Sequence, residues 1–186
     1  AKYKKNTAPS NSICYLGSLD WLPNSEGVDW FINNVWSSLQ KSSEYEFYLA
    51  GRNMPNRFYK YASSQLHVLG EVHDAIDFIN EHKVVIVPLF SGSGMRVKII
   101  EALALGKVVI GTNLAFEGIE GVKHKINAIV CDTPNQFVEN ITEVLKNDKL
   151  YKAISDNGKN LIEKNYSIES STKKLITFYE TLIHGA

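Results

Sequence analysis

Hydrophobic residues along the chain alternate between short continuous runs and longer segments in which they recur every three or four positions. The continuous runs are typical of strands covered on both faces of a parallel sheet, and the spaced pattern is typical of amphipathic helices. This pattern predicts strands over residues 12–16, 46–50, 65–69, 83–88, 108–111 and 128–131. It predicts helices over residues 29–40, 75–81, 95–105, 148–165 and 167–184. A further helix is expected to begin at Pro134, after a capping box formed by Thr133 and Gln136, with an apolar stripe from Phe137 to Leu145.

The order of these elements sets the fold class. Helices separate most of the strands, and this alternation implies parallel strands joined by right-handed crossovers. We therefore expect an α/β, doubly wound, Rossmann-like three-layer sandwich with a six-stranded parallel sheet. The polar segment 1–10 reads as a linker or tail, and residues 11–186 as one domain.

Composition supports a single globular domain without a general affinity for nucleic acid. The 186 residues are 44% hydrophobic and 22% charged, and 20 Lys+Arg balance 20 Asp+Glu. The global basic field of a nucleic-acid-binding protein is therefore missing, so a bound anion must be held locally.

The longest apolar run, 84–90, is far shorter than the ~20 residues of a membrane span. The two distant cysteines, Cys14 and Cys131, are expected to be buried free thiols, which favours a cytoplasmic location.

Ligands of an open parallel sheet bind beyond the carboxyl ends of the strands, near the point where strand order reverses. In the common order 3-2-1-4-5-6, that point lies between the first and fourth strands. The segments 17–27 and 89–94 follow these strands, so we expect the binding site there.

The segment after the fourth strand has the stronger signal. Gly92 and Gly94 allow unusual backbone angles, and Arg96 and Lys98 then occupy the expected first turn of a helix. Cations at a helix N-terminus oppose the helix dipole, and a bound phosphate would resolve that conflict. We favour phosphate binding over a flexible loop whose cations face water. Glu101 could accept hydrogen bonds from a ribose diol or pair with Lys98, and the spacing leaves both open.

The segment after the first strand gives a weaker signal. Gly17 and Ser18 could lie beneath phosphates, but from these residues alone an ordinary turn that leads into a helix is the better interpretation. Trp21 lies in the same loop, and it is the one tryptophan that we consider for stacking on a sugar or a base.

These motifs together resemble the C-terminal half of a GT-B glycosyltransferase of the retaining family 4 type. The resemblance is carried by GSLDWLPNSEGVDW (17–30), PLFSGSGMRVKIIEALALGKVVIG (88–111) and FEG (116–118), with Lys98 and Glu101-Ala102 in the most specific segment. It implies one half of a GT-B fold that binds a nucleotide-sugar, with no other cofactor. It also implies that the last helix crosses back toward the partner domain.

The resemblance assigns roles to individual residues. Glu101 would hold the donor ribose, the main chain at Gly94, Met95, Arg96 and Val97 would meet the distal phosphate, and Gly17-Ser18 would lie under the diphosphate. The loop at Val72 would border the nucleobase. Two departures stand out: Ser93 replaces the first glutamate of the family's Glu-x7-Glu pair, and residues 18–24 lack the basic residue common in relatives. Arg96 and Lys98 would supply that positive charge and stabilise the leaving group.

We therefore expect the donor-binding domain of a retaining glycosyltransferase that acts in glycan or polysaccharide biosynthesis. The N-terminal acceptor-binding domain is absent, so this chain should bind nucleotide without transferring sugar to a glycan or lipid-linked acceptor. Membrane attachment through the absent half stays open. No Asp-x-Asp or closely spaced histidines occur, so no metal site is expected. The alternatives are a non-catalytic nucleotide-binding module and a sugar-nucleotide epimerase of similar build.

Overall fold

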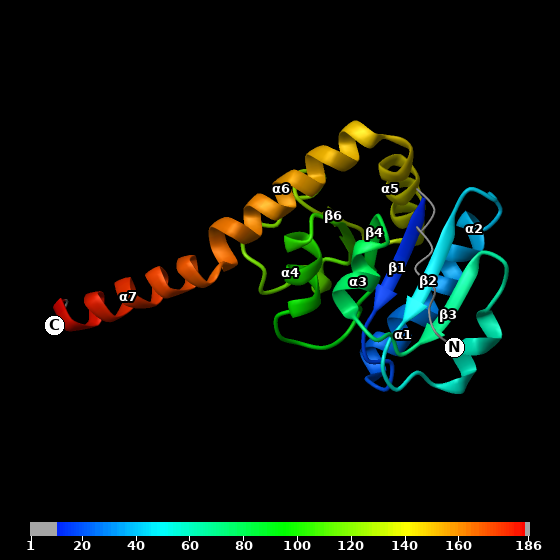
Figure 1. Cartoon of the computed structure of the whole chain (residues 1–186), viewed down its shortest axis with the longest axis horizontal. Helices are drawn as coiled ribbons and strands as arrows, with labels where there is room; N and C mark the ends of the chain where they lie inside the picture. Colours follow the sequence, from blue (N-terminus) through cyan, green and yellow to red (C-terminus); the bar gives the residue numbers. More distant parts are fainter. Residues whose placement is uncertain (1–10, 185–186) are drawn as a thin grey trace.

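The computed structural model describes residues 11–184, so the linker expected over 1–10 lies outside the described residues. Its centre is a six-stranded, all-parallel sheet in the order β3-β2-β1-β4-β5-β6 (Figure 1). The strands are β1 (Ser12–Leu16), β2 (Glu46–Ala50), β3 (Leu66–Gly70), β4 (Val84–Val87), β5 (Val108–Gly111) and β6 (Ile129–Val130). The fold class and the expected strand order are therefore confirmed.

Both faces of the sheet are buried. Every residue of β4 and β5 is buried, as expected from their uninterrupted apolar runs. One hydrophobic core joins the sheet to α1 (Leu22–Phe31) and α5 (Pro134–Lys146). The other joins it to α3 (Ala75–Asn80) and α4 (Val97–Ala104). The three layers follow from these two cores.

The helix α1 corrects the expected helix over 29–40. It begins at Leu22, and the later part of the predicted helix is a π-helix, η1 (Ile32–Trp36), followed by a short α2 (Ser37–Leu39). The hydrophobic pattern missed the first turns because Asn24 and Ser25 are polar residues that are buried there. Proline is tolerated in the first turn, so Pro23 does not prevent this early start.

The other helical predictions differ at their ends. α4 begins at Val97 rather than at residue 95, because Gly92 and Gly94 have positive φ angles and the ψ of Arg96, 88°, lies outside the helical region. The expected capping box of Thr133 and Gln136 is present at the start of α5. The 3-10 helices η2 (Asn56–Tyr61) and η3 (Leu114–Phe116) were not predicted.

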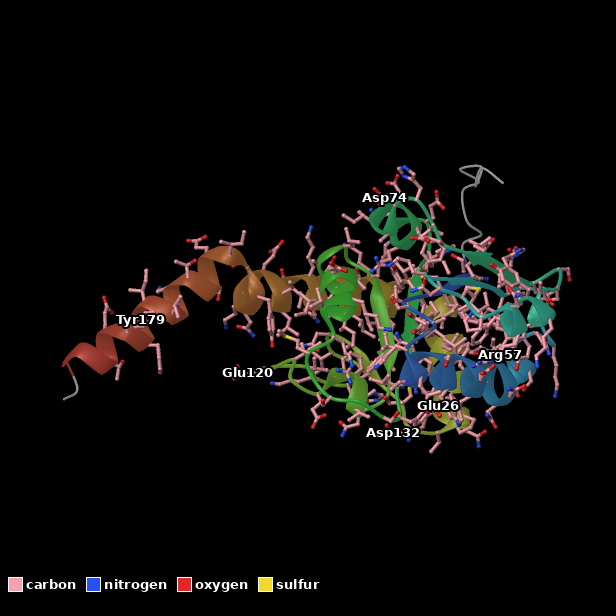
Figure 2. All side chains as sticks on the ribbon, turned by 90° about the horizontal axis from the view of Figure 1, so that it is seen from below. Glu26, Arg57, Asp74, Glu120, Asp132 and Tyr179 are labelled. Carbon is pink, nitrogen blue, oxygen red and sulfur yellow. The ribbon has the colours of Figure 1, made fainter. Side chains whose placement is uncertain are left out.

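Two long helices end the described chain. They are α6 (Asp148–Tyr166) and α7 (Ile168–His184), and α7 extends beyond the body of the domain (Figure 1). Several of its large apolar side chains are exposed, and Figure 2 shows Tyr179 standing clear of the sheet. No helix among residues 11–184 has the length and apolar character needed to span a membrane.

The backbone approaches itself closely at two glycines. A Cβ atom on Gly27 of α1 would lie 1.8 Å from the carbonyl oxygen of Pro88, just after β4. A Cβ atom on Gly51 would lie at the same distance, 1.8 Å, from the carbonyl oxygen of Gly17. Both contacts are backbone contacts near the carboxyl ends of the strands, so they fix the segments that border the expected site.

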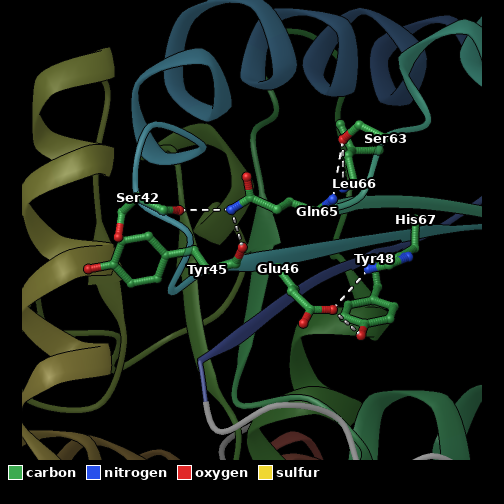
Figure 3. A network of polar contacts seen from close by, with 8 residues as sticks. All are labelled: Ser42, Tyr45, Glu46, Tyr48, Ser63, Gln65, Leu66 and His67. Carbon is green, nitrogen blue, oxygen red and sulfur yellow. Dashed lines mark hydrogen bonds and ion pairs between the residues drawn. The ribbon is translucent and has the colours of Figure 1, made fainter.

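A polar network lies where β2 begins, at the opposite end of that strand from the expected site (Figure 3). Glu46 accepts hydrogen bonds from the Tyr48 hydroxyl at 2.6 Å and from His67 Nε2 at 2.9 Å. The Tyr48 ring is stacked on His67 and also packs against His82, with centroid distances of 4.5 and 4.4 Å. The pKa of buried His82 is lowered to about 4, first by burial and then by Lys107 and His67.

Candidate functional site

Lys98 lies at the switch point between β1 and β4. Its ammonium group donates to Tyr15 Oη and to Asn24 Oδ1, each at 3.3 Å, and it stands 4.5 Å from the centre of the Tyr15 ring. Among residues 11–184, no carboxylate lies within ion-pair distance of Lys98. A partly buried cation is therefore held by neutral groups only.

This environment lowers the pKa of Lys98 from 10.5 to about 7. Burial is the largest cause, and the charge of Arg96 adds to it. Desolvation disfavours the charged form of an amine, so an anion placed beside Nζ would restore the charge and gain from it. The ammonium group thus lacks a counter-ion that a ligand could provide.

Arg96 is the second cation of the site. It is the N-cap residue of α4, one position before the helix rather than in its first turn as expected, and only 8% of it is exposed. Nη1 donates to the carbonyl oxygens of Ser93 and Gly94. Nε and Nη2 are buried, and neither has a hydrogen-bond partner in the described part of the chain. A buried guanidinium with two unmatched donors is costly unless an acceptor arrives.

Asn24 connects the loop after β1 to α4. Its amide nitrogen donates to the carbonyl of Ser18 at 2.8 Å while its amide oxygen accepts from Lys98. Neither Asn24 nor Tyr15 was predicted as a site residue. The one signal in the sequence was the amide of Asn24 directly after Pro23, because a side-chain amide that is buried in the first turn of a helix needs hydrogen-bond partners.

Gly17 makes room for this arrangement. A Cβ atom there would lie 2.9 Å from Tyr15 Oη and 3.3 Å from Lys98 Nζ. The backbone at the end of β1 therefore comes close to the cation, at a position where a side chain would not fit without a shift of its neighbours.

Two clefts meet at Gly17, Ser18 and Lys98. The first, which we call the β2–β3 cleft, has a volume of about 370 Å³ and is also lined by Leu16, Gly51, Arg52, Glu71, Val72, His73 and Ala75. The second, which we call the Trp21 cleft, has a volume of about 440 Å³ and is also lined by Trp21, Asn24, Met95, Arg96 and Val97. A ligand that spans both clefts must therefore pass Lys98.

The structure brings most of the predicted site residues together. Gly17, Ser18, Val72, Met95, Arg96, Val97 and Lys98 line one or both clefts. Ser93 and Gly94 lie in the adjoining exposed loop, where their carbonyl groups hold Arg96. Glu101 is exposed on α4, one turn after Lys98, and does not line either cleft. Arg52 and His73 line the β2–β3 cleft without having been predicted.

The chemistry of the site is that of an anion receptor. The N-terminus of α4 presents backbone N–H groups and the positive end of its dipole beside Lys98 and Arg96. No group of three His, Cys, Asp or Glu side chains suited to a metal ion occurs in the part of the chain that the structure describes. The arrangement suits a diphosphate, whose two charges match the two cations.

Sequence comparison identifies relatives of the chain. The family model described as glycosyl transferases group 1 matches residues 10–147. An uncharacterized glycosyltransferase of Methanocaldococcus jannaschii is 22% identical over 132 residues, covering 67% of this chain and 32% of the relative. An uncharacterized 44.6 kDa protein in the cps region of Klebsiella pneumoniae is 24% identical over 180 residues, covering 89% and 45%. The chain thus spans 32% and 45% of the length of these curated relatives.

Structure comparison finds the same fold in GT-B glycosyltransferases. The C-terminal domain of a glycosyl transferase group 1 family protein (LpcC) from Francisella tularensis has a TM-score of 0.71 at 18% identity, covering 87% of this chain and 88% of that one. Anabaena HepE in complex with UDP-glucose has a TM-score of 0.72 at 12% identity, covering 91% and 48%. TarM from S. aureus, in a complex that contains UDP, has a TM-score of 0.76 at 15% identity, covering 91% and 36%.

Proposed function

The chain belongs to the group 1 glycosyltransferases, and from this premise we propose that it binds the diphosphate of a nucleotide-sugar between Lys98 and the N-terminus of α4. It would act as the donor-binding part of a retaining glycosyltransferase. The observation that carries the proposal is the uncompensated charge of Lys98 and Arg96 at the sheet's switch point.

The proposed roles follow from the distances. Lys98 would contact both phosphates from above Gly17, and Arg96 would offer Nε and Nη2 to the phosphate nearer the sugar. Cleavage of the sugar–phosphate bond leaves a nucleoside diphosphate with one more negative charge. Cations already in place stabilise that developing charge without reorganising, which is how this half would assist the reaction. The site would need no metal ion for this purpose.

The class of donor is inferred from two sources. Anabaena HepE has been crystallised with UDP-glucose and with UDP, and S. aureus TarM with UDP. The β2–β3 cleft has room for a nucleoside, with Val72 on its wall and the loop after β3 beside it. Glu101 would turn toward the ribose hydroxyls from the next turn of α4. We therefore propose a nucleoside diphosphate sugar as the ligand, with a uridine nucleotide as the first to test.

The acceptor belongs to the proposal for the whole enzyme. Because the chain spans less than half of its curated relatives, an acceptor-binding half would complete the active site, and α7 would reach toward it. A glycan or lipid-linked acceptor and a role in polysaccharide biosynthesis fit the relative from the cps region. The enzyme would work in the cytoplasm, where nucleotide-sugars are made.

The decisive experiment is a calorimetric titration of this chain with UDP, GDP, ADP and CMP, repeated with Lys98→Met. We expect one diphosphate to bind, CMP to bind more weakly, and the Lys98→Met variant to lose at least tenfold in affinity. Lys107→Met is the matched control, since Lys107 lies between α4 and β5 and lines neither cleft. Binding that is unchanged in Lys98→Met, or lost equally in Lys107→Met, would refute the proposed site.

A further inference from the structure

The indole of Trp21 forms a wall of the Trp21 cleft beside the two cations. Trp21 is 41% exposed although it lies in a loop whose neighbour Leu19 is fully buried. One edge of the ring lies against Gly92, where a Cβ atom would come within 2.9 Å of the indole. The Arg96 guanidinium is 5.7 Å from the ring centre. The ring is therefore held in position by the loop after β4 and still offers surface to the cleft.

The two clefts give a bound nucleotide-sugar a direction. They share only Gly17, Ser18 and Lys98, so a diphosphate at Lys98 directs its two substituents into different clefts. The β2–β3 cleft is bordered by the polar residues Arg52, Glu71 and His73 and receives the nucleoside under the proposed function. The Trp21 cleft then remains for the sugar.

The Trp21 cleft has the surface that a sugar ring recognises. Trp21, Met95 and Val97 line it with exposed apolar groups, the last two being 51% and 58% exposed. A pyranose has one face made mainly of C–H groups, and such a face packs on an indole, while its hydroxyls remain free for the polar groups at the rim. Asn24 and the loop carbonyls of Ser93 and Gly94 lie nearby as polar partners.

We infer that the sugar of the donor stacks on the indole of Trp21. Trp21 would then determine how much more tightly the site binds a nucleotide-sugar than the bare nucleotide. This inference rests on the proposed function, because it assumes the diphosphate at Lys98.

The test compares the affinities of UDP and UDP-glucose for the wild-type chain, Trp21→Ala and Leu22→Ala. Leu22 is the matched control, since it is the next residue, is 62% exposed and does not line the cleft. In Trp21→Ala we expect the UDP affinity to stay within about twofold and the UDP-glucose affinity to fall at least fivefold. Leu22→Ala should leave both unchanged.

Saturation-transfer NMR provides a second readout that a purely structural role would not change. Irradiation of the protein methyl resonances, where the ligand has no protons, should transfer magnetisation to the glucose ring protons in the wild type. The transfer to glucose relative to uracil should drop in Trp21→Ala. If Trp21→Ala lowers the affinities for UDP and UDP-glucose equally, Trp21 acts through Arg96 and not through the sugar. If it lowers neither affinity, Trp21 does not belong to the site. Either result overturns the inference. If the wild type binds neither UDP nor another diphosphate, the proposed function itself has failed.

Discussion

Asn24 and Lys98 are joined by a hydrogen bond of 3.3 Å between the amide oxygen and the ammonium group, across 74 positions of sequence. The neutral amide accepts one hydrogen bond from the ammonium group without neutralising its charge, so a negatively charged ligand can still pair with Lys98. The same amide holds the carbonyl of Ser18, so one side chain fixes both walls of the proposed diphosphate site.

Replacing this amide by a carboxylate should weaken nucleotide binding strongly. Asn24→Asp is nearly isosteric, but its carboxylate would pair with Lys98 and repel a diphosphate, and it can no longer donate to the Ser18 carbonyl. We expect at least a tenfold loss of affinity in calorimetry, with an unchanged circular dichroism spectrum. Asn24→Ser, which adds no charge, should bind more tightly than Asn24→Asp; the reverse order would contradict the electrostatic role.

Nucleotide affinity should decrease as the pH rises above neutrality. The pKa of Lys98 is about 7 in the free protein, and a bound diphosphate would raise it, so binding takes up a proton above pH 7. Between pH 7 and 9, where the terminal phosphate of the nucleotide is already ionised, the dissociation constant should increase by up to about tenfold per pH unit. Lys98→Arg should flatten this dependence, because arginine stays charged. A pH-independent affinity in the wild type would exclude Lys98 as the partner of the diphosphate.

The free domain should become more stable when Lys98 is removed. Its pKa is lower in the folded protein than the ordinary value of 10.5, so the unfolded chain binds more protons between pH 7 and pH 10.5. Stability due to this group therefore increases with pH across that window and is lost as the pH falls toward 7. Lys98→Met removes the desolvated charge, so urea unfolding at pH 7 should show a higher free energy of unfolding and a weaker pH dependence. A less stable Lys98→Met would indicate that the lysine has a structural role.

Acid should destabilise the protein through His82. Its folded pKa of about 4 lies below the usual 6.5, so stability is fully present above pH 6.5 and is lost as the pH falls toward 4. Over that window the loss amounts to about 3 kcal/mol. Urea unfolding at several pH values should show a smaller acid loss in His82→Gln than in the wild type. His73→Gln, at an exposed histidine, should keep the wild-type profile, and an equal change in both variants would contradict the assignment.

Two glycines should give opposite phenotypes when changed to alanine. In Gly51→Ala the new Cβ meets the backbone oxygen of Gly17 at 1.8 Å, and a backbone clash cannot be relieved by a side-chain rotation. We expect destabilisation of about 1–3 kcal/mol or more in denaturant unfolding. In Gly17→Ala the new Cβ meets the side-chain ends of Tyr15 and Lys98 rather than backbone, so nucleotide affinity should fall more than stability. Equal stability losses in the two variants would show that the side-chain tips are as rigid as the backbone.

The sequence predicted the sheet well because each buried strand has a continuous apolar run, as in Val84–Val87. It also placed Gly17 and Lys98 after the strands that flank the switch point, and the structure brings both residues to the two clefts there. It missed the start of α1 because Asn24 is polar and buried, which a hydrophobic pattern cannot distinguish from a loop. The partners of Lys98 were missed for the same reason: Tyr15 belongs to the apolar run of β1, and only the folded sheet brings its hydroxyl to the ammonium group.

The close backbone contact between Gly27 and Pro88 couples the two segments that flank the switch point. Since no side chain fits between α1 and the end of β4 at this contact, a change in the backbone path of one segment requires a matching change in the other. Loop exchange between relatives should therefore succeed when residues 17–30 and 88–101 are transplanted together. A chimera that carries only one of the two would join segments shaped for different neighbours.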